Sequence, residues 1–179
     1  LIGAATAYSL SKLGNKVVIL EQKAKFDRKN ILDKRTTAIS EGTKKFLDEI
    51  DIWKDISNYS EPIKKIQIVD RNQSNKIYFD NQRRKSNLGY IVKNEFILDS
   101  LYKKLEKQNN VKIFNNISLK DIFYESGKII TKQNNFLINA DLLISSDGKK
   151  SFVRKFFKTP IFSKDYKKQA IVINFFHSK

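Results

Sequence analysis

The chain has 179 residues, of which 40% are hydrophobic and 30% charged, a balance typical of a soluble globular protein with a substantial core. No apolar run approaches the roughly 20 residues that a membrane-spanning helix needs. The absence of Cys excludes disulfides, thiolate metal sites and cysteine nucleophiles, and the single histidine, His177, cannot build a histidine-rich metal cluster.

The net charge of +16 makes nucleic acid a candidate partner of this chain. The positive charges are nevertheless spread along the chain, and the longest clusters, Arg83-Arg84-Lys85 and Lys149-Lys150, are short. The aromatic residues stand at core-periodic places and do not alternate with Lys and Arg on one face, which disfavours a nucleic-acid-binding domain. A solvated basic surface and attraction to an anionic membrane face are the two readings left open.

The first 21 residues predict half of a dinucleotide-binding unit. Residues 3–13 are rich in Ala, Leu and Ser and predict a helix, which Gly14-Asn15 ends with a left-handed turn. Residues 16–20 form a β-branched apolar run typical of a strand in a parallel sheet, and the run ends at Glu21. This order is that of the second half of a βαβ unit. Because the helical pattern is already under way at Leu1, we expect the first strand and the leading glycines to precede it.

The middle of the chain predicts two helices with a pair of strands between them. Ser40 caps the first helix, which runs to about Ile56 in a region that Pro62 ends. Asn94 caps the second helix, which covers about residues 95–108. The other elements expected here are a loop over residues 24–34 and strands over residues 66–69 and 76–79.

The last third of the chain predicts more strands than helices. Its expected elements are a strand over residues 111–114, an antiparallel meander over 117–124, 128–131 and 135–138, a buried strand over 141–145, a basic helix over 151–157 and a strand over 169–176. The strands over residues 17–20, 111–114 and 142–145 are short, apolar and separated by helices. We therefore expect them in one parallel sheet, with the meander attached to it.

Gly3 and Glu21 form the first group of candidate binding residues. The start of a helix presents free N–H groups and partial positive charge, and a pyrophosphate binds there. A carboxylate at the end of the next strand, 18 positions on, accepts hydrogen bonds from both ribose hydroxyls of a dinucleotide. A helix-packing glycine and an exposed glutamate would give the same pattern.

Two further groups follow along the chain. Arg35 and Thr36 open a run of small residues ahead of a helix, where a guanidinium can clamp a diphosphate, although a surface arginine would look the same. Asp147 and Gly148 emerge from the carboxyl end of an expected buried strand, where open α/β sheets place ligands. A plain strand-to-helix turn also favours Asp-Gly.

These groups and two further motifs occur in an order typical of one family. In chain order the motifs are the helix with Gly3, the strand with Glu21, Asp33-Lys34-Arg35-Thr36-Thr37-Ala38-Ile39-Ser40, Leu88-Gly89-Tyr90-Ile91-Val92, and the stretch from Ala140 to Arg154 that contains Asp147-Gly148. Together they resemble the FAD-dependent aromatic hydroxylases of the para-hydroxybenzoate hydroxylase fold. The Arg-Thr-Thr-Ala string and Pro62-Ile63-Lys64-Lys65-Ile66 indicate the ubiquinone-biosynthesis branch. The resemblance covers essentially the whole chain, and the Asp-Gly stretch is its most specific motif.

The resemblance implies roles for individual residues. It implies that Gly3 lies by the FAD pyrophosphate and that Glu21 binds the adenosine ribose. Arg35, Thr36 and Asn94 would line the FAD. Asp147 and Gly148 would serve the binding of both FAD and NAD(P)H, and Arg154 belongs to the same turn. The family's Gly-Asp motif, which binds the flavin ribityl and diphosphate, is expected beyond Lys179. We therefore expect the chain by itself to be inactive and to bind FAD poorly.

The fold implied by the resemblance is α/β and has two parts. Residues 1–62 and 90–160 would form a Rossmann-like FAD-binding domain with a β-meander and without its first strand. Residues 63–89 and 161–179 would form part of a β-rich substrate domain. The elements expected from the sequence agree with this division: the buried strand over residues 141–145 and the meander fall in the FAD-binding part, and the strands over residues 66–69 and 76–79 fall in the substrate part.

The activity implied is that of a monooxygenase acting on an aromatic ring of a ubiquinone precursor. NAD(P)H would reduce the FAD, and one oxygen atom of O2 would pass to the phenolic ring, with no catalytic side chain in this chain. The expected partners are a polyprenylated phenol or quinone precursor and a peripheral membrane or ubiquinone-biosynthesis complex, without nucleic acid. The expected location is cytoplasmic, or peripheral at the inner membrane surface. A flavin reductase or dehydrogenase of the same fold is the alternative within the class.

Overall fold

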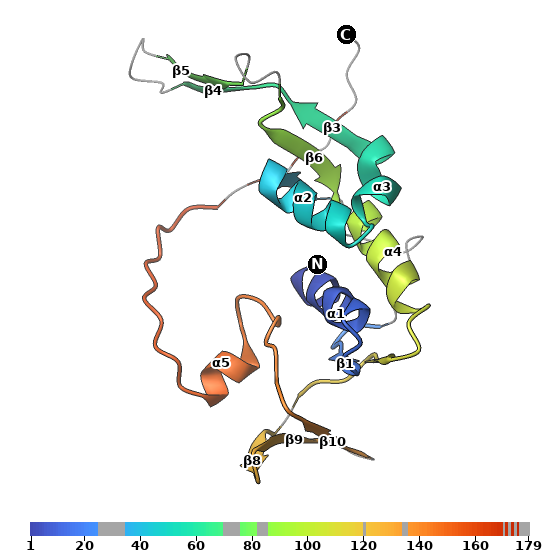
Figure 1. Ribbon diagram of the computed structural model, residues 1–179. Helices are drawn as coiled ribbons and strands as arrows, with labels where there is room; N and C mark the ends of the chain where they lie inside the picture. Colours follow the sequence, from blue (N-terminus) through green and yellow to red (C-terminus); the bar gives the residue numbers. More distant parts are fainter. Residues whose placement is uncertain are drawn as a thin grey trace. The chain divides into compact units, whose positions relative to one another are not determined.

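The computed structural model describes residues 1–24, 35–69, 76–81, 86–119, 121–133, 136–169, 171, 173 and 175 (Figure 1). The chain divides into two compact units. The first unit consists of Leu1 and Asp27–Lys104, and the second unit consists of Ile2–Phe26 and Leu105–Lys179. Each unit contains both helices and strands.

The second unit begins with the helix, turn and strand that the sequence predicts. α1 (Ile2–Lys12) is followed by Gly14, whose φ of +84° is a left-handed value that glycine adopts without strain. β1 (Val17–Leu20) pairs in parallel with β7 (Val111–Phe114). The expected helix and two of the three expected parallel strands are therefore confirmed.

The side chain of Asn110 ties the end of α1 to the start of β7. Its Nδ2 donates to the carbonyl oxygen of Ser11 at 2.9 Å and to that of Asn15 at 2.7 Å. The Ser11 carbonyl lies in the last turn of α1 and also accepts from the N–H of Gly14 at 3.0 Å, whereas the Asn15 carbonyl lies in the turn between α1 and β1. One side-chain amide thus satisfies two backbone acceptors and links the end of α1 and the following turn to the start of β7.

The antiparallel meander is also present in the second unit. β8 (Phe123–Glu125), β9 (Lys128–Gln133) and β10 (Phe136–Ala140) form a sheet of order β10-β9-β8. Gly127 lies in the turn between β8 and β9 with a φ of +77°. The expected meander is confirmed, although its first strand covers Phe123–Glu125 and the described residues 117–119, 121 and 122 are not in a strand. The meander is a separate sheet, and no pairing of it to the β1–β7 strands is found among the described residues.

The expected buried strand over residues 141–145 is wrong. This segment has no regular secondary structure, and the side chains of Leu142 and Ile144 are 69% and 46% exposed. A strand needs a neighbour that receives its N–H and C=O groups. Within the described part of the chain, β1 pairs with β7 and no strand pairs with residues 141–145. Within the described residues, the parallel sheet therefore has the two strands β1 and β7 and not three.

The last helix is the predicted basic one. α5 (Phe152–Phe156) has Ser151 as its N-cap, and residues 157–169 that follow it form neither helix nor strand. For the strand expected over residues 169–176, the described residues 169, 171, 173 and 175 are not in a strand. The remaining residues of that prediction lie outside the described residues.

Three short strands form the sheet of the first unit. β2 (Thr36–Ile39), β6 (Gly89–Lys93) and β3 (Ser60–Ile63) are antiparallel, in the order β2-β6-β3. The sequence analysis missed all three. β2 is rich in small polar residues, and Pro62 looks like a terminator, yet β3 lies at the sheet edge, where the missing N–H of proline leaves no ladder bond unmade.

The single helix expected from Ser40 to Ile56 is in fact two helices. α2 (Glu41–Glu49) has Ser40 as its N-cap, as predicted, and α3 (Trp53–Ile56) follows after a break. Asp51 lies in the break with a φ of +59°, and its N–H donates to the carbonyl oxygen of Asp48 at 2.9 Å. Short polar side chains such as Asp tolerate this left-handed conformation, and it ends the helix.

The other described elements of the first unit are a hairpin, a 3-10 turn and a helix of 12 residues. The elements are η2 (Ser57–Tyr59), β4 (Lys65–Val69), β5 (Lys76–Asp80) and α4 (Asn94–Leu105). β4 and β5 pair antiparallel, which confirms the two strands expected there. α4 ends three residues earlier than expected and buries Leu101 and Leu105 completely. Of the expected loop over residues 24–34, only Ala24 is described.

Candidate functional site

In the second unit, the start of α1 lies against the segment that follows β10. A Cβ atom built on Gly3 would stand 3.1 Å from Ser146 Cβ and 3.6 Å from Ser146 Oγ. The side chain of Ser146 can lie this close to α1 because Gly3 has no side chain. Figure 1 shows this segment, in orange between β10 and α5, turning back toward α1. The first turn of α1 has no acidic residue, so no negative side chain in that turn opposes the partial positive charge of its free N–H groups.

Glu21 extends the parallel pair by one residue at its carboxyl end. Its N–H donates to the carbonyl oxygen of Phe114 at 2.9 Å, and its own carbonyl oxygen accepts from the N–H of Ile117 at 3.0 Å. The half-buried side chain turns back, because Oε1 accepts from the N–H of Lys23 at 3.0 Å. A carboxylate has about four acceptor positions. Glu21 can therefore accept further hydrogen bonds from a ligand at this edge.

The carboxylate of Asp147 holds the turn before α5. Oδ1 accepts from Ser145 Oγ at 2.5 Å, and Oδ2 accepts from the N–H groups of Phe152 at 2.6 Å and Val153 at 3.3 Å. Gly148, the next residue, has a φ of +80°, which only glycine adopts readily. Asp147 thus satisfies the first free N–H groups of α5, and Gly148 allows the chain to turn there.

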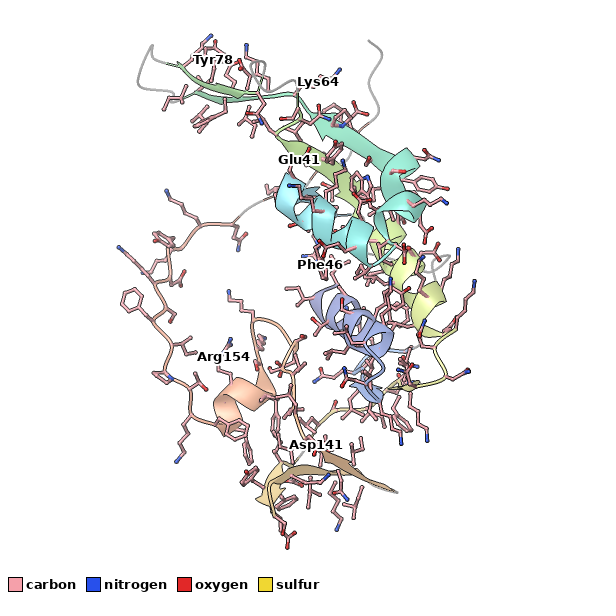
Figure 2. All side chains as sticks on the ribbon, in the orientation of Figure 1. Glu41, Phe46, Lys64, Tyr78, Asp141 and Arg154 are labelled. Carbon is pink, nitrogen blue, oxygen red and sulfur yellow. The ribbon has the colours of Figure 1, made fainter. Side chains whose placement is uncertain are left out.

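Arg154 closes the same turn from the helix side. Its guanidinium donates through Nη2 to the carbonyl oxygen of Lys149, and its N–H donates to Ser151 Oγ at 3.0 Å. Figure 2 shows Arg154 on α5. These two hydrogen bonds hold Arg154 to the residues of the Asp147 turn.

These hydrogen bonds change the acidity of Asp147. The carboxylate is exposed, and the small loss of water around it by itself raises the pKa of Asp147. Hydrogen bonds from the hydroxyls of Ser145 and Ser151 and from backbone N–H groups, including that of Val153, stabilise the ionised form more strongly. The pKa of Asp147 is therefore lowered from 3.8 to about 2. The residue is a carboxylate over the whole physiological pH range.

We expect the turn to lose stability in acid and on substitution of Asp147. Because the pKa is lower in the folded state, the stabilisation is complete above about pH 4 and is lost as the pH falls through about 2. Asp147→Asn should lower the free energy of unfolding at pH 7 by about 0.5–1 kcal/mol, a modest value because the group is exposed and screened. Urea unfolding between pH 7 and pH 2 measures both effects. Glu125→Gln, which neutralises an exposed carboxylate, should leave stability unchanged; equal losses would contradict this role.

The remaining predicted residues meet in the first unit. Asn94 begins α4, and its Oδ1 accepts from Thr37 Oγ1 at 2.5 Å, while its N–H donates to the carbonyl oxygen of Arg35 at 3.0 Å. Thr36 stands opposite Lys93 in the β2–β6 ladder. Asn94 is buried, whereas Arg35 and Thr36 are exposed. Asn94 therefore positions the β2 end that carries the arginine.

The predicted residues are divided between the two units. The second unit holds Gly3, Glu21, Asp147 and Gly148, and the first unit holds Arg35, Thr36 and Asn94. Sequence reasoning missed Thr37 and Ser146 as their neighbours. Thr37 lies inside the Arg-Thr-Thr-Ala string, and Ser146 directly precedes Asp147. Their position in or beside a motif is the sequence signal that could have identified them.

The chain matches the family described as FAD binding domain over residues 1–178. It belongs to this FAD-binding family. The resemblance drawn from the sequence is confirmed, and so is the mixed α/β class of the FAD-binding domain, which the similar structures share.

Curated relatives of this FAD-binding domain carry names from ubiquinone biosynthesis. The ubiquinone biosynthesis monooxygenase COQ6 of Drosophila melanogaster is 28% identical over 193 residues, which cover 96% of this chain and 39% of the relative. The ubiquinone hydroxylase UbiL of Rhodospirillum rubrum is 23% identical over 184 residues, which cover 100% of this chain and 42% of the relative. The chain thus spans about two fifths of the length of these relatives.

Solved structures share the fold of this FAD-binding domain. A Pseudomonas aeruginosa PqsL variant has a TM-score of 0.76 at 14% identity, covering 92% of this chain and 45% of its own. The p-nitrophenol 4-monooxygenase PnpA of Pseudomonas putida has a TM-score of 0.68 at 21% identity, covering 86% and 40%. At these identities the likeness concerns the fold alone.

Proposed function

We propose that this chain is the FAD-binding part of a monooxygenase that hydroxylates an aromatic ring of a ubiquinone precursor with NAD(P)H and O2. The observation that carries the proposal is the approach of Gly3 to Ser146, which brings the start of α1 beside the Asp147 turn. The relatives named for ubiquinone biosynthesis favour this substrate class over others.

The second unit offers groups that fit two parts of FAD. The first N–H groups of α1 at Gly3 suit a diphosphate, since a helix start binds anions and no acidic residue stands in that turn. The carboxylate of Glu21 suits the adenosine ribose, because it can accept from two hydroxyls. Asp147 has both oxygens engaged by Ser145 and α5, so we assign it the positioning of the turn at Gly148.

The first unit offers groups that suit the phosphates and polar edges of the cofactor. Arg35 supplies a guanidinium that can pair with a diphosphate in bidentate fashion. Thr36 adds a hydroxyl beside it, and the hydrogen bond between Asn94 and Thr37 holds this end of β2. We propose that Arg35, Thr36 and Asn94 line the FAD.

In this reaction the residues of the chain bind the cofactor. Bound FAD would accept two electrons from NAD(P)H and activate O2. One oxygen atom enters the ring as a hydroxyl, and the other leaves as water with the two electrons of NAD(P)H. The residues of this chain bind and orient the cofactor, and we assign the described side chains no proton transfer to the substrate.

The remaining parts of the proposal concern partners and place. The substrate would be a polyprenylated phenol or quinone precursor, and the protein would work in the cytoplasm or at the inner membrane surface, in contact with a ubiquinone-biosynthesis complex. Among the described residues, no helix has the length and apolar character to cross a membrane. Because the chain spans about two fifths of its relatives, we propose that it is inactive by itself.

The test is the transfer of labelled oxygen by the protein that contains this chain. We expect FAD-dependent oxidation of NAD(P)H that is stimulated by a prenylated phenol, with one atom of 18O from 18O2 in the product by mass spectrometry. NAD(P)H oxidation without label in the product would replace the proposal by a reductase or dehydrogenase of the same fold. Label from water instead of O2 would also overturn it.

A further inference from the structure

Asp147 is the one Asp or Asn residue of the sequence that a glycine follows. Such a pair can rearrange without an enzyme, because a glycine has no side chain to keep its backbone N from the carboxyl carbon of the preceding residue. Gly148 has a φ of +80°, and a Cβ atom built on it would meet nothing within 4 Å. The described residues around Gly148 therefore place no steric block on this rearrangement.

The rearrangement exchanges a backbone bond of Asp147 for a bond to its side chain. The backbone N of Gly148 attacks Cγ of Asp147 and an N–C bond forms. The hydroxyl of the carboxyl group leaves as water together with the proton of the N–H group. Water then opens the cyclic imide. When it adds to the α-carbonyl carbon, the original peptide bond breaks and the chain continues through Cγ as isoaspartate, with water as the one co-reactant and no net change in composition.

In the folded chain the carboxylate of Asp147 is held away from this reaction. Oδ1 accepts from Ser145 Oγ at 2.5 Å, and Oδ2 accepts from the N–H of Phe152 at 2.6 Å, five positions further on. Cγ must leave these partners to reach the N of Gly148. The pKa of Asp147, lowered to about 2, acts in the same direction, because a carboxylate resists attack by a nucleophile more than the neutral carboxyl group does.

We propose that the peptide bond between Asp147 and Gly148 is a site of spontaneous isoaspartate formation, whose rate is set by the hydrogen bonds from Ser145 and from the start of α5. Opening of the turn releases the carboxylate and allows the ring to close. Isoaspartate lengthens the backbone by one carbon and displaces the carboxylate, so the contacts with the N–H groups of Phe152 and Val153 are lost. The proposal does not depend on the proposed function, because it uses the contacts of this turn alone.

The test compares folded and unfolded protein during incubation at neutral pH. The protein that contains this chain is kept in buffer or in urea and digested with trypsin. Electron-transfer fragmentation of the peptide that ends at Lys149 then distinguishes isoaspartate from aspartate. Because a helix-cap contact shifts an equilibrium by roughly twofold to thirtyfold, we expect isoaspartate at Asp147 to form about tenfold more slowly in the folded protein. In urea, Gly148→Ala should slow the reaction severalfold, since the added Cβ hinders the attack.

Two serine variants test the role of the hydrogen bonds in the folded protein. Ser145→Ala removes one partner of the carboxylate and should speed the reaction by about threefold, a modest factor because the bond is exposed. Asp147 accepts from Ser145 and from α5, so Ser146→Ala, which removes the neighbouring exposed hydroxyl, should leave the rate unchanged. Asp99, which precedes Ser100 in α4, is the internal reference for general unfolding.

Four results would overturn the proposal. The first is equal rates of isoaspartate formation at Asp147 in folded and unfolded protein, and the second is no isoaspartate there in either. The third is the same rate in the Ser145→Ala and Ser146→Ala variants. The fourth is a Ser145→Ala variant that reacts faster at Asp99 by the same factor as at Asp147, because general unfolding would then explain the change.

Discussion

Replacing Gly89 by alanine is expected to lower the melting temperature of the chain by roughly 5–10 °C. A Cβ atom at this position would lie 2.5 Å from the carbonyl oxygen of Ile39 and 3.6 Å from Ser40 Cα. Both neighbours are backbone, so the β2 and β6 strands must move apart. Overpacking of this kind costs about 2–3 kcal/mol. For a chain of this length each kcal/mol corresponds to about 2–4 °C.

Gly42→Ala provides the matched control for this substitution. Gly42 lies in the first turn of α2, and a Cβ there would meet only Ser40 Oγ, at an ordinary distance of 3.9 Å. Because alanine favours a helix by up to about 1 kcal/mol over glycine, this variant should be as stable as the unchanged chain or more stable. Thermal unfolding followed by circular dichroism compares the two. Similar melting temperatures for both variants would contradict the close approach of Gly89 to Ile39.

Replacing Glu21 by alanine is expected to weaken FAD binding by about tenfold or more. The variant removes a carboxylate that we assign to both ribose hydroxyls, and each hydrogen bond to a charged group is worth roughly 1.5–3 kcal/mol. The measurement is a fluorescence titration with FAD, carried out on the protein that contains this chain. Glu21→Gln, which keeps one acceptor oxygen, should bind FAD with intermediate affinity.

Glu21 also accepts a hydrogen bond from Lys23, so a local effect must be separated from a cofactor effect. Melting temperatures of the variants without FAD report the local effect, which should be small because the bond is exposed. Glu125→Ala removes an exposed carboxylate from β8 and should leave FAD affinity unchanged. Unchanged FAD affinity in Glu21→Ala, with or without a lower melting temperature, would refute the assignment.

Elements with local signals could be predicted from the sequence. Ser40 and Ser151 each accept a backbone N–H at the start of a helix, and Gly14 ends α1 with a positive φ. These features depend on residues within four positions of one another, which is why a sequence pattern contains them. The apolar run of β1 was equally clear, because four successive apolar residues suit a strand in a parallel sheet.

The sequence could not predict elements that depend on a distant partner. Residues 141–145 have the composition of a buried strand, yet a strand forms only where another segment pairs with it. β3 includes Pro62 and is a strand because β6 lies beside it. The composition of a segment indicates its tendency to form a strand. Whether it forms one depends on which other segment the fold places beside it.

The sequence by itself determined the family and the types of candidate residue: a glycine at a helix start, a carboxylate after a strand and an Asp-Gly turn. Tertiary structure alone decided what those residues touch. It placed Gly3 against Ser146, 143 positions away, and engaged both oxygens of Asp147 within its own turn. The physical reason is range: capping and turn preferences act over a few residues, whereas close approach and hydrogen-bond partners depend on where packing brings distant backbone together.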